Sequence, residues 1–348
     1  MKLFFLTLSV LPFLSGTGHA DDHLLVTFGG FVDTYYAYDF NNSQILDRSF
    51  TTQPARHNEF NVNLAHLDAK VSASRIRGRF ALQAGTSVQS NYAAESSLSR
   101  HIQEATAGYQ VTDRLWIDAG IFLAHIGFES WISKENWTYT RSLIADYSPY
   151  YETGVKATYR WADRFSTQLL VLNGWQNISE NNGSKAFGAQ VAYNPIDKMF
   201  LTYNNFLGNE LGRRRRFFND FIAKFELTDA FSVAGSYDVG WQQTTDEQSN
   251  SLWQGYAIFL RYQVTSKLAL TARGEQYFDK DQVIVVTNTP NGFQITSASI
   301  NADLLLHKNL MWRSEVRGYW SRDAVFPSKS RGLLASDSLA VTSLSLWF

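Results

Sequence analysis

The stretch A-V-T-S-L-S-L-W-F (residues 340–348) ends the chain and predicts a lipid-facing β-strand. Because alternate side chains of a strand lie on opposite faces, Leu344, Leu346 and Phe348 share one face and the serines between them share the other. A soluble protein gains little by ending on an exposed row of Leu and Phe, whereas a membrane strand places that row against lipid. We therefore expect the last strand to lie in a membrane with its apolar face outward.

Three internal stretches show the same alternation of apolar and polar residues over the length of a strand. They are I-R-G-R-F-A-L-Q-A-G-T-S-V (76–88), F-S-V-A-G-S-Y-D-V-G-W-Q (231–242) and L-A-L-T-A-R-G-E-Q-Y-F (268–278). A period of two is typical of a half-buried strand. Each stretch is therefore expected to form a strand with one apolar face and one polar or charged face.

Short polar motifs recur along the chain and predict tight turns between strands. V-T-D-R-L near residue 111 is one of five such motifs that precede a large apolar residue, and two further turns are expected near residues 72 and 307. These tight turns, alternating with longer connections, imply about sixteen antiparallel strands, an even number that suits a single-chain barrel. Because lipid offers no partner to a backbone polar group, the last strand is expected to pair with the first.

The predicted fold class is all-β: a closed transmembrane antiparallel β-barrel with short periplasmic turns and long extracellular loops. The composition agrees, since aromatic residues make up 15% of the chain although its mean hydropathy is −0.23. A barrel with aromatic girdles on its outside and a water-filled lumen accounts for both the high aromatic content and the slightly polar mean hydropathy. A soluble array of β-sandwiches is the alternative, but it would leave the charged strand faces with nothing to pack against.

The first twenty residues predict a cleaved secretory signal peptide, which leaves residues 21–348 to form the barrel. They combine one positive charge, an apolar run of about twelve residues and small residues before Asp21. A membrane anchor would need about 18 to 20 apolar residues. The remaining chain has 30 basic and 32 acidic residues and no cysteine, which excludes an overall basic nucleic-acid binder, a disulfide framework and a thiolate zinc site.

Long motifs in the first half of the chain carry a family resemblance. They include R-H-N-E-F-N-V-N-L-A-H-L (56–67), A-L-Q-A-G-T-S-V-Q-S-N-Y-A-A-E (81–95) and A-G-I-F-L-A-H-I-G-F-E-S (119–130). These motifs resemble the OmpL-like outer-membrane β-barrel porin family, which implies a porin role in the outer membrane of a Gram-negative bacterium. Phe348 is similar to the C-terminal aromatic signature that the barrel-insertion machinery reads, so we assign it to closure and insertion.

The polar strand faces are expected to line the lumen. A barrel of about 16 to 18 strands leaves an aqueous channel, so the predicted function is a passive, water-filled channel for small hydrophilic solutes or ions. Charges at a constriction set ion preference. Arginines from strands near both ends of the chain are expected to form a pore-lining basic wall: Arg77, Arg79, Arg273, Arg313 and Arg317. Alternatively, they are ordinary lumen residues in hydrated ion pairs.

The longest connection runs from about residue 124 to residue 149 and is too apolar for a mobile external loop. The third long loop of general porins folds inward, and by that similarity we expect this connection to narrow the pore. The alternative is that it packs against a neighbouring subunit or the outer rim. Five charged residues are candidates for facing the basic wall at the constriction: Glu129, Lys134, Glu135, Arg141 and Asp146.

Four consecutive arginines are expected on a loop at the membrane rim: Arg213, Arg214, Arg215 and Arg216. Guanidinium groups pair well with phosphate, so the cluster could bind lipopolysaccharide phosphates or draw anions towards the pore mouth. The alternative is a solvated run of charge without a binding role.

The sequence offers no signature of chemistry. It lacks H-E-x-x-H, G-x-S-x-G and phosphate-loop motifs, so we expect no catalytic residue, cofactor, metal or nucleic-acid partner. The expected partners are outer-membrane lipids, lipopolysaccharide, the insertion machinery and small hydrophilic solutes, with a homotrimer by similarity to general porins. The alternative function is a gated or plugged outer-membrane receptor or adhesin barrel.

Overall fold

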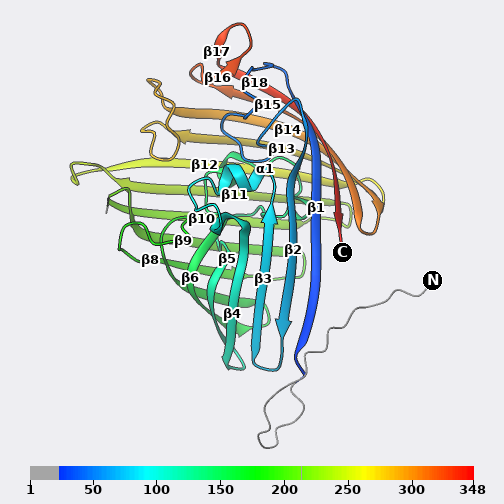
Figure 1. Ribbon diagram of the computed structural model, residues 1–348, viewed down its shortest axis with the longest axis vertical. Coiled ribbons are helices and arrows are strands. Elements are labelled where there is room, and N and C mark those ends of the chain that lie inside the picture. The colour runs from blue at the N-terminus through cyan, green and yellow to red at the C-terminus, as the bar shows by residue number, and fades with distance from the viewer. Residues whose placement is uncertain (1–22, 213) are drawn as a thin grey trace, which may run out of the picture.

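The computed structural model describes residues 23–212 and 214–348, whose strands close into one barrel (Figure 1). Each barrel strand is antiparallel to its two neighbours, and the first pairs with the last to complete the ring. The predicted closed barrel of sixteen antiparallel strands is therefore confirmed. The barrel strands are β1 Leu25–Asp39, β2 Phe60–Ser72, β3 Ile76–Ala84, β4 Ile102–Thr112, β5 Leu115–Leu123, β6 Tyr151–Ala162, β7 Phe165–Leu172, β8 Ala186–Tyr193, β9 Met199–Glu210, β10 Arg214–Glu226, β11 Phe231–Gln243, β12 Asn250–Gln263, β13 Leu268–Asp279, β14 Phe293–His307, β15 Leu310–Ser321 and β18 Ser336–Trp347.

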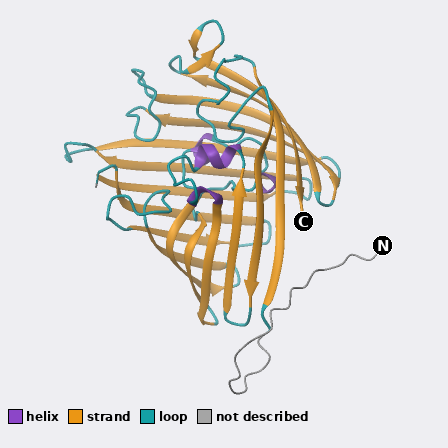
Figure 2. Ribbon diagram, in the orientation of Figure 1, coloured by secondary structure: helices purple, strands orange, loops and turns teal. Residues whose placement is uncertain are grey.

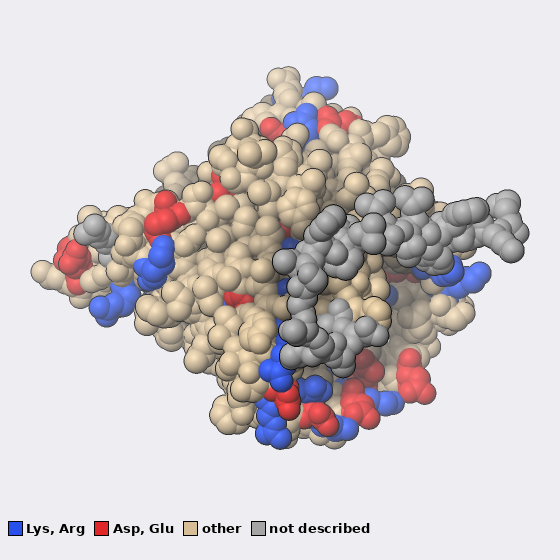
Figure 3. Space-filling model, turned by 60° about the horizontal axis from the view of Figure 1, so that its bottom comes forward, with Lys and Arg blue, Asp and Glu red and all other residues tan. Residues whose placement is uncertain are grey.

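Tight turns join the strands at one end of the barrel, where the polar motifs predicted them. For example, β4 ends at Thr112 and β5 begins at Leu115, so Asp113 and Arg114 make the turn. Acidic and basic side chains gather along this end of the molecule, and few interrupt the broad surface above it (Figure 3). This distribution suits a barrel whose middle lies in lipid and whose rims meet water.

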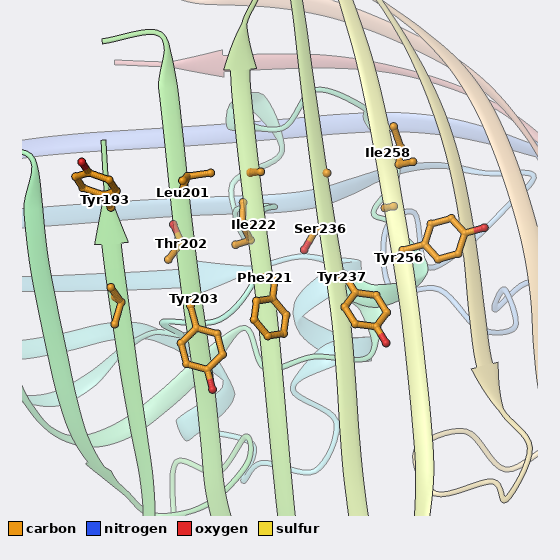
Figure 4. Close-up of a pocket in the computed structure, with 14 residues that line it drawn as sticks. Tyr193, Leu201, Thr202, Tyr203, Phe221, Ile222, Ser236, Tyr237, Tyr256 and Ile258 are labelled. Carbon is orange, nitrogen blue, oxygen red and sulfur yellow. The ribbon is translucent and has the colours of Figure 1, made fainter. Parts of the chain in front are cut away.

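Side chains alternate between the outer face and the lumen. On β11, Tyr237 is 39% exposed on the outside, whereas its neighbour Asp238 is 3% exposed on the inside. Tyr203, Phe221, Tyr237 and Tyr256 are register partners on β9 to β12 and form an aromatic row across the outer face (Figure 4). They line a shallow, mostly apolar groove of about 650 Å³ that faces away from the lumen.

Small elements occupy the loops at the other end of the barrel (Figure 2). They are the helices α1 Thr86–Asn91 and α2 Leu143–Asp146, the 3₁₀ turns η1 Ser99–His101 and η2 Ser133–Glu135, and a separate hairpin of β16 Phe326–Ser328 and β17 Gly332–Leu334. Among residues 23–212 and 214–348, no helix has the length and hydrophobicity needed to cross a membrane.

The strand predicted over residues 76–88 is shorter than expected. It ends at Ala84, and Thr86 and Val88 belong to α1, so the prediction was wrong for them. Gly85 ends the strand because its φ of 138° is rarely accessible to other residues, and a side chain there would collide with the backbone of Asn63. Alternation of residue types alone did not reveal this backbone reversal.

The C-terminus closes the barrel against β1. The Phe348 amide donates a hydrogen bond to the Gly30 carbonyl at 3.1 Å, and the Gly30 amide donates to the Phe348 carbonyl at 3.3 Å. The Phe348 ring lies on the outside, 69% exposed, directly over Gly30. A Cβ at Gly30 would lie 2.4 Å from that ring, so a larger residue there would have to move the terminal aromatic from its place at the seam.

Replacing Gly30 with Val should weaken closure, because the new side chain would displace the Phe348 ring from the seam. We expect G30V to lower the free energy of unfolding by less than the roughly 1–3 kcal/mol that overpacking a closed core costs, because the exposed Phe348 ring can move. Urea unfolding of the refolded barrel, followed by its heat-modifiable gel mobility, measures the loss. Gly274→Val is the matched control, since a Cβ at that position meets nothing within 4 Å. Equal stability of the two variants would contradict the role given to Gly30.

Candidate functional site

The connection between β5 and β6, residues 124–150, folds into the barrel and fills part of its lumen. Its central residues Thr138 and Thr140 are fully buried. Gly127, with a φ of 98°, redirects the chain, and the Ser142 side chain begins α2 by accepting a hydrogen bond from a backbone amide of that helix. We call residues 124–150 the inward loop.

Apolar packing fixes one side of the inward loop. Helix α2 places Leu143 and Ile144 in the largest buried apolar cluster, together with Trp253 and Phe259 of β12. Gly255 of β12 allows this approach, because a Cβ at that position would lie 2.6 Å from the Ile144 side chain. The loop is therefore held to the wall by shape as well as by polar contacts.

Three arginines of the predicted basic wall hold the other side of the inward loop. Arg273 donates to the Thr140 carbonyl at 2.7 Å, and Arg317 donates to the Arg141 carbonyl at 2.6 Å. Arg313 donates to the carbonyls of Ser133 and Asn136. All three arginines are at most 2% exposed. Their guanidinium groups therefore bind loop carbonyls and do not face open water.

Carboxylates on the same wall neutralise these arginines. Glu275 lies 2.6 Å from Arg317, Asp303 lies 2.7 Å from Arg313, and Glu315 lies 3.1 Å from Arg273. Glu315 also accepts a hydrogen bond from the Thr140 amide at 2.6 Å. These ion pairs are buried, and their hydrogen bonds to the loop compensate for the cost of removing the charges from bulk water.

The remaining two arginines of the predicted wall lie on β3, whereas the three that bind the inward loop lie on β13 and β15. Arg77 makes two hydrogen bonds to Asp118, at 2.6 and 2.5 Å, and its side chain is 43% exposed. Arg79 pairs with Asp68 at 3.3 Å and with Glu104. The five arginines therefore form two separate groups. The pair on β3 is in contact with water, whereas Arg273, Arg313 and Arg317 are buried.

Two acidic residues of the inward loop are buried in different surroundings. The Glu129 carboxylate accepts hydrogen bonds from the amide and hydroxyl of Ser142 and lies 3.7 Å from Arg273. Asp146 instead accepts from the amide and hydroxyl of Thr52, on the connection between β1 and β2. Burial raises the pKa of both carboxyl groups. Glu129 thus approaches the wall arginines, whereas Asp146 joins two loops.

Arg141 holds the inward loop together from within. Its guanidinium lies over the rings of Trp131 and Tyr150, at 4.6 and 4.1 Å from their centroids, and it donates to Gln53 at 2.8 Å. Arg141 is fully buried. It therefore binds neighbouring loop residues and does not reach the carboxylates of the wall.

Lys134 and Glu135 lie at the edge of the inward loop that faces the strand closure. Lys134 is 3.6 Å from Glu135 and 5.4 Å from the ring centroid of Trp347. The Glu135 side chain is 51% exposed, so this pair meets water, whereas most of the loop is buried.

The arginine run is divided by the alternation of β10. Arg216 points into the lumen, is 5% exposed and lies near the rings of Trp175 and Trp253. Arg215 is exposed, and Arg214 is half-buried; Arg213 lies outside the described residues. The cluster is therefore not one continuous patch, because neighbouring strand residues face opposite sides.

The sequence analysis did not single out Asp33, which joins three parts of the structure. This fully buried carboxylate accepts hydrogen bonds from Asn63 of β2 at 2.8 Å, Ser133 of the inward loop at 2.8 Å and Ser345 of β18 at 3.0 Å. The alternation in β1 could have placed Asp33 on the lumen face. Its three partners could not have been predicted, because two of them lie at least 100 residues away.

Cavities remain in the lumen beside the inward loop. One of about 480 Å³ lies along β8 to β10 and is lined by polar and charged residues that include His125, Asn204 and Lys224. It reaches Asp197 and Lys198 in the turn between β8 and β9. A second, of about 230 Å³, is lined by residues including Arg79, Lys134 and Glu135. Both involve the end of the barrel that carries the tight turns.

Residues 25–348 match the protein family described as "Putative beta-barrel porin-2, OmpL-like". The chain belongs to the OmpL-like β-barrel porin family. The family resemblance noted in the first half is therefore confirmed and extends over the whole barrel. As a member of this family, the chain is an outer-membrane porin that forms a passive channel. Comparison with curated proteins gave no match.

Solved structures with the same fold include a porin, an outer-membrane channel and another outer-membrane protein. The anion-selective porin from Comamonas acidovorans is 10% identical, with a TM-score of 0.61 over 94% of this chain and 100% of that one. The outer-membrane channel DcaP of Acinetobacter baumannii is 12% identical, with a TM-score of 0.61 over 93% and 97%. The trimer form of OmpT from Vibrio cholerae is 8% identical, with a TM-score of 0.61 over 94% and 100%. At these identities the likeness shows the fold alone.

Proposed function

We propose that this OmpL-like porin conducts small hydrophilic solutes or ions through a lumen that the inward loop narrows. The observation that carries the proposal is the burial of the loop against β13 and β15, where Arg273 and Arg317 bind its carbonyls. The loop leaves a cavity of about 480 Å³ along β8 to β10, a volume that admits only small solutes. Solutes would move down their own gradient, so the channel requires no catalytic residue, cofactor or metal.

Deleting residues 130–140 should raise the single-channel conductance in a planar bilayer, because the deletion removes the segment bound by Arg273 and Arg313. We expect a severalfold increase, with the barrel still showing heat-modifiable gel mobility. Deletion of residues 245–248, in the exposed connection between β11 and β12, is the matched control and should leave conductance unchanged. Unchanged conductance in both folded variants would contradict the constriction.

A plugged barrel is the second candidate function. It is favoured by the mutual burial of several connections between strands inside the lumen. Gln53, from the connection between β1 and β2, is fully buried and donates a hydrogen bond to the Tyr139 carbonyl of the inward loop at 3.0 Å. If the folded wild-type barrel carries no current and the variant lacking residues 130–140 does, the resting barrel is closed. A gated receptor or an adhesin would then replace the open channel.

We further propose that three copies of this porin assemble as a homotrimer, supported by the trimer form of OmpT, which shares the fold. The mass of the protein in detergent tests this, and a monomer mass would contradict it.

We also propose that the mature chain begins at Asp21 after signal-peptide cleavage, which N-terminal sequencing tests; residues 1–20 lie outside the described residues. The exposed Phe348 is the proposed insertion signal for the assembly machinery.

Arg215 is the residue of the arginine run best placed to bind a lipopolysaccharide phosphate, because it is exposed near the loop end of β10. We expect Arg215→Ala to weaken association with lipopolysaccharide severalfold and to leave conductance in plain phospholipid unchanged. Arg216→Ala is the matched control, since Arg216 is buried on the lumen side and should not affect lipid binding. Equal lipopolysaccharide binding by the wild type and R215A would contradict this assignment.

A further inference from the structure

His125, near the start of the inward loop, lies against the barrel wall with both ring nitrogens bound. Its Nδ1 lies 2.9 Å from the Glu152 carboxylate of β6, and its Nε2 lies 2.9 Å from the backbone carbonyl oxygen of Asn205 on β9. Both of these partners are hydrogen-bond acceptors. An imidazole donates from both nitrogens only when it carries both protons, so this geometry fits the imidazolium form.

The surroundings of Glu152 place the shared proton on the ring. Glu152 is fully buried, and its Oε1 oxygen has no hydrogen-bond partner among the described residues. Within residues 23–212 and 214–348, His125 is the only basic side chain within salt-bridge distance of that carboxylate. A buried carboxylate without a cation is costly, and an imidazole binds a proton more tightly than a carboxylate does. The pair is therefore an imidazolium and a carboxylate.

The wall is shaped to receive the His125 ring. Gly188 of β8 lies beside it, and a Cβ at that position would lie 2.7 Å from the ring. On β9, the side-chain oxygen of Asn205 accepts from the Ala189 amide at 3.1 Å, so the Asn205 carbonyl can accept from His125. Gln190 of β8 donates to the His125 backbone carbonyl at 2.8 Å. Strands β6, β8 and β9 therefore hold this one residue of the loop.

The charged groups around His125 favour its protonated form. Besides Glu152, Asp220 of β10 acts on the ring, and its carboxylate accepts from the neighbouring Gly127 amide at 2.8 Å. Lys156 of β6 interacts with Glu152 from beyond salt-bridge distance. The residues that β8 and β9 present to the ring do not titrate. Burial lowers the pKa of His125, but the neighbouring carboxylates and the carbonyl acceptor raise it above its usual value of 6.5.

His125 also lines the cavity of about 480 Å³ along β8 to β10, the space that the inward loop leaves for small solutes. Gly127 and Phe128 follow it along the chain and line the same cavity. Because this first segment of the loop forms one side of the cavity, a movement of His125 away from the wall changes the width of the cavity. The charged residues that line the rest of it are Asp197, Lys198, Lys224 and Glu226.

We propose that His125 in its charged form positions the start of the inward loop, and that loss of its proton at alkaline pH widens the adjoining cavity. The inference rests on the proposed channel function. A neutral ring keeps one N–H, which stays with the Glu152 carboxylate because that hydrogen bond is charge-assisted. The other nitrogen then presents a lone pair to the Asn205 carbonyl oxygen, and the two acceptors repel each other. His125 is thus a positioning residue for the first segment of the loop, whereas the wall arginines hold the rest.

The pH dependence of the single-channel conductance tests the proposal. The stabilisation that His125 provides is complete below its usual pKa of 6.5 and is lost as the pH rises through the higher pKa of the folded state. Conductance should therefore rise between about pH 6 and pH 9. The rise should be smaller than the severalfold increase expected on deletion of residues 130–140. Constant conductance of the folded wild type over this range would overturn the proposal.

Two substitutions separate the charge of His125 from its packing. His125→Gln cannot become charged, so its conductance should be independent of pH and equal to that of the wild type at high pH. Glu152→Gln removes the carboxylate that holds the proton, so the rise in conductance should move to lower pH; this variant also covers the case in which H125Q does not fold. His307→Gln, at the exposed end of β14, is the matched control and should keep the wild-type pH profile. A wild-type profile in folded H125Q or E152Q would contradict the role given to His125.

A second measurement separates failure of this anchor from failure of the channel. Nitrogen NMR of the histidine rings in the refolded porin, with H125Q used to assign the signal, reports whether both ring nitrogens of His125 carry a proton. A charged ring that titrates above its usual pKa, in a barrel without conductance, would overturn the channel function and retain the anchor. A ring that is already neutral below its usual pKa, in a barrel that conducts, would overturn the anchor and retain the channel.

Discussion

The placement of the inward loop depends on buried hydrogen bonds from arginine guanidinium groups to backbone carbonyls. A guanidinium removed from water needs partners for its donors, and Arg273, Arg313 and Arg317 find them in the loop and in carboxylates of the wall. The loop backbone needs donors equally, because it lies inside the barrel without regular secondary structure over most of its length. The arginine donors and the loop carbonyls therefore satisfy one another's hydrogen-bonding capacity. These hydrogen bonds fix the loop in one position.

This arrangement changes what the lumen charges can do. Arginines along a water-filled pore would attract anions, whereas these arginines are paired with Glu275, Asp303 and Glu315 and are covered by the loop. Among the residues that the structure describes, several buried carboxylates form no salt bridge, and Asp220 on β10 and Asp238 on β11 are two of them. The number of arginines on the wall therefore does not by itself set the charge that a solute in the lumen meets.

The strands and turns could be predicted because they depend on local patterns. The alternation of residue types with a period of two predicts which side chains of β11 and β13 share a face. The polar motifs predict the tight turns between neighbouring strands. The environment of a lumen residue could not be predicted, because its partners are distant in the chain: Arg313 binds the carbonyl of Asn136. The arginine run shows the same limit, since the sequence suggests one patch and the strand directs Arg215 and Arg216 to opposite faces.

The most direct test of this account is the accessibility of the inward loop to water in the folded porin. The chain has no cysteine, so single substitutions can be read with a water-soluble thiol reagent. Ala145→Cys, at a position 5% exposed, should react far more slowly than Glu135→Cys, where the native side chain is 51% exposed. Fast and equal modification at both positions would show a loop that does not stay against the wall, and it would contradict the account.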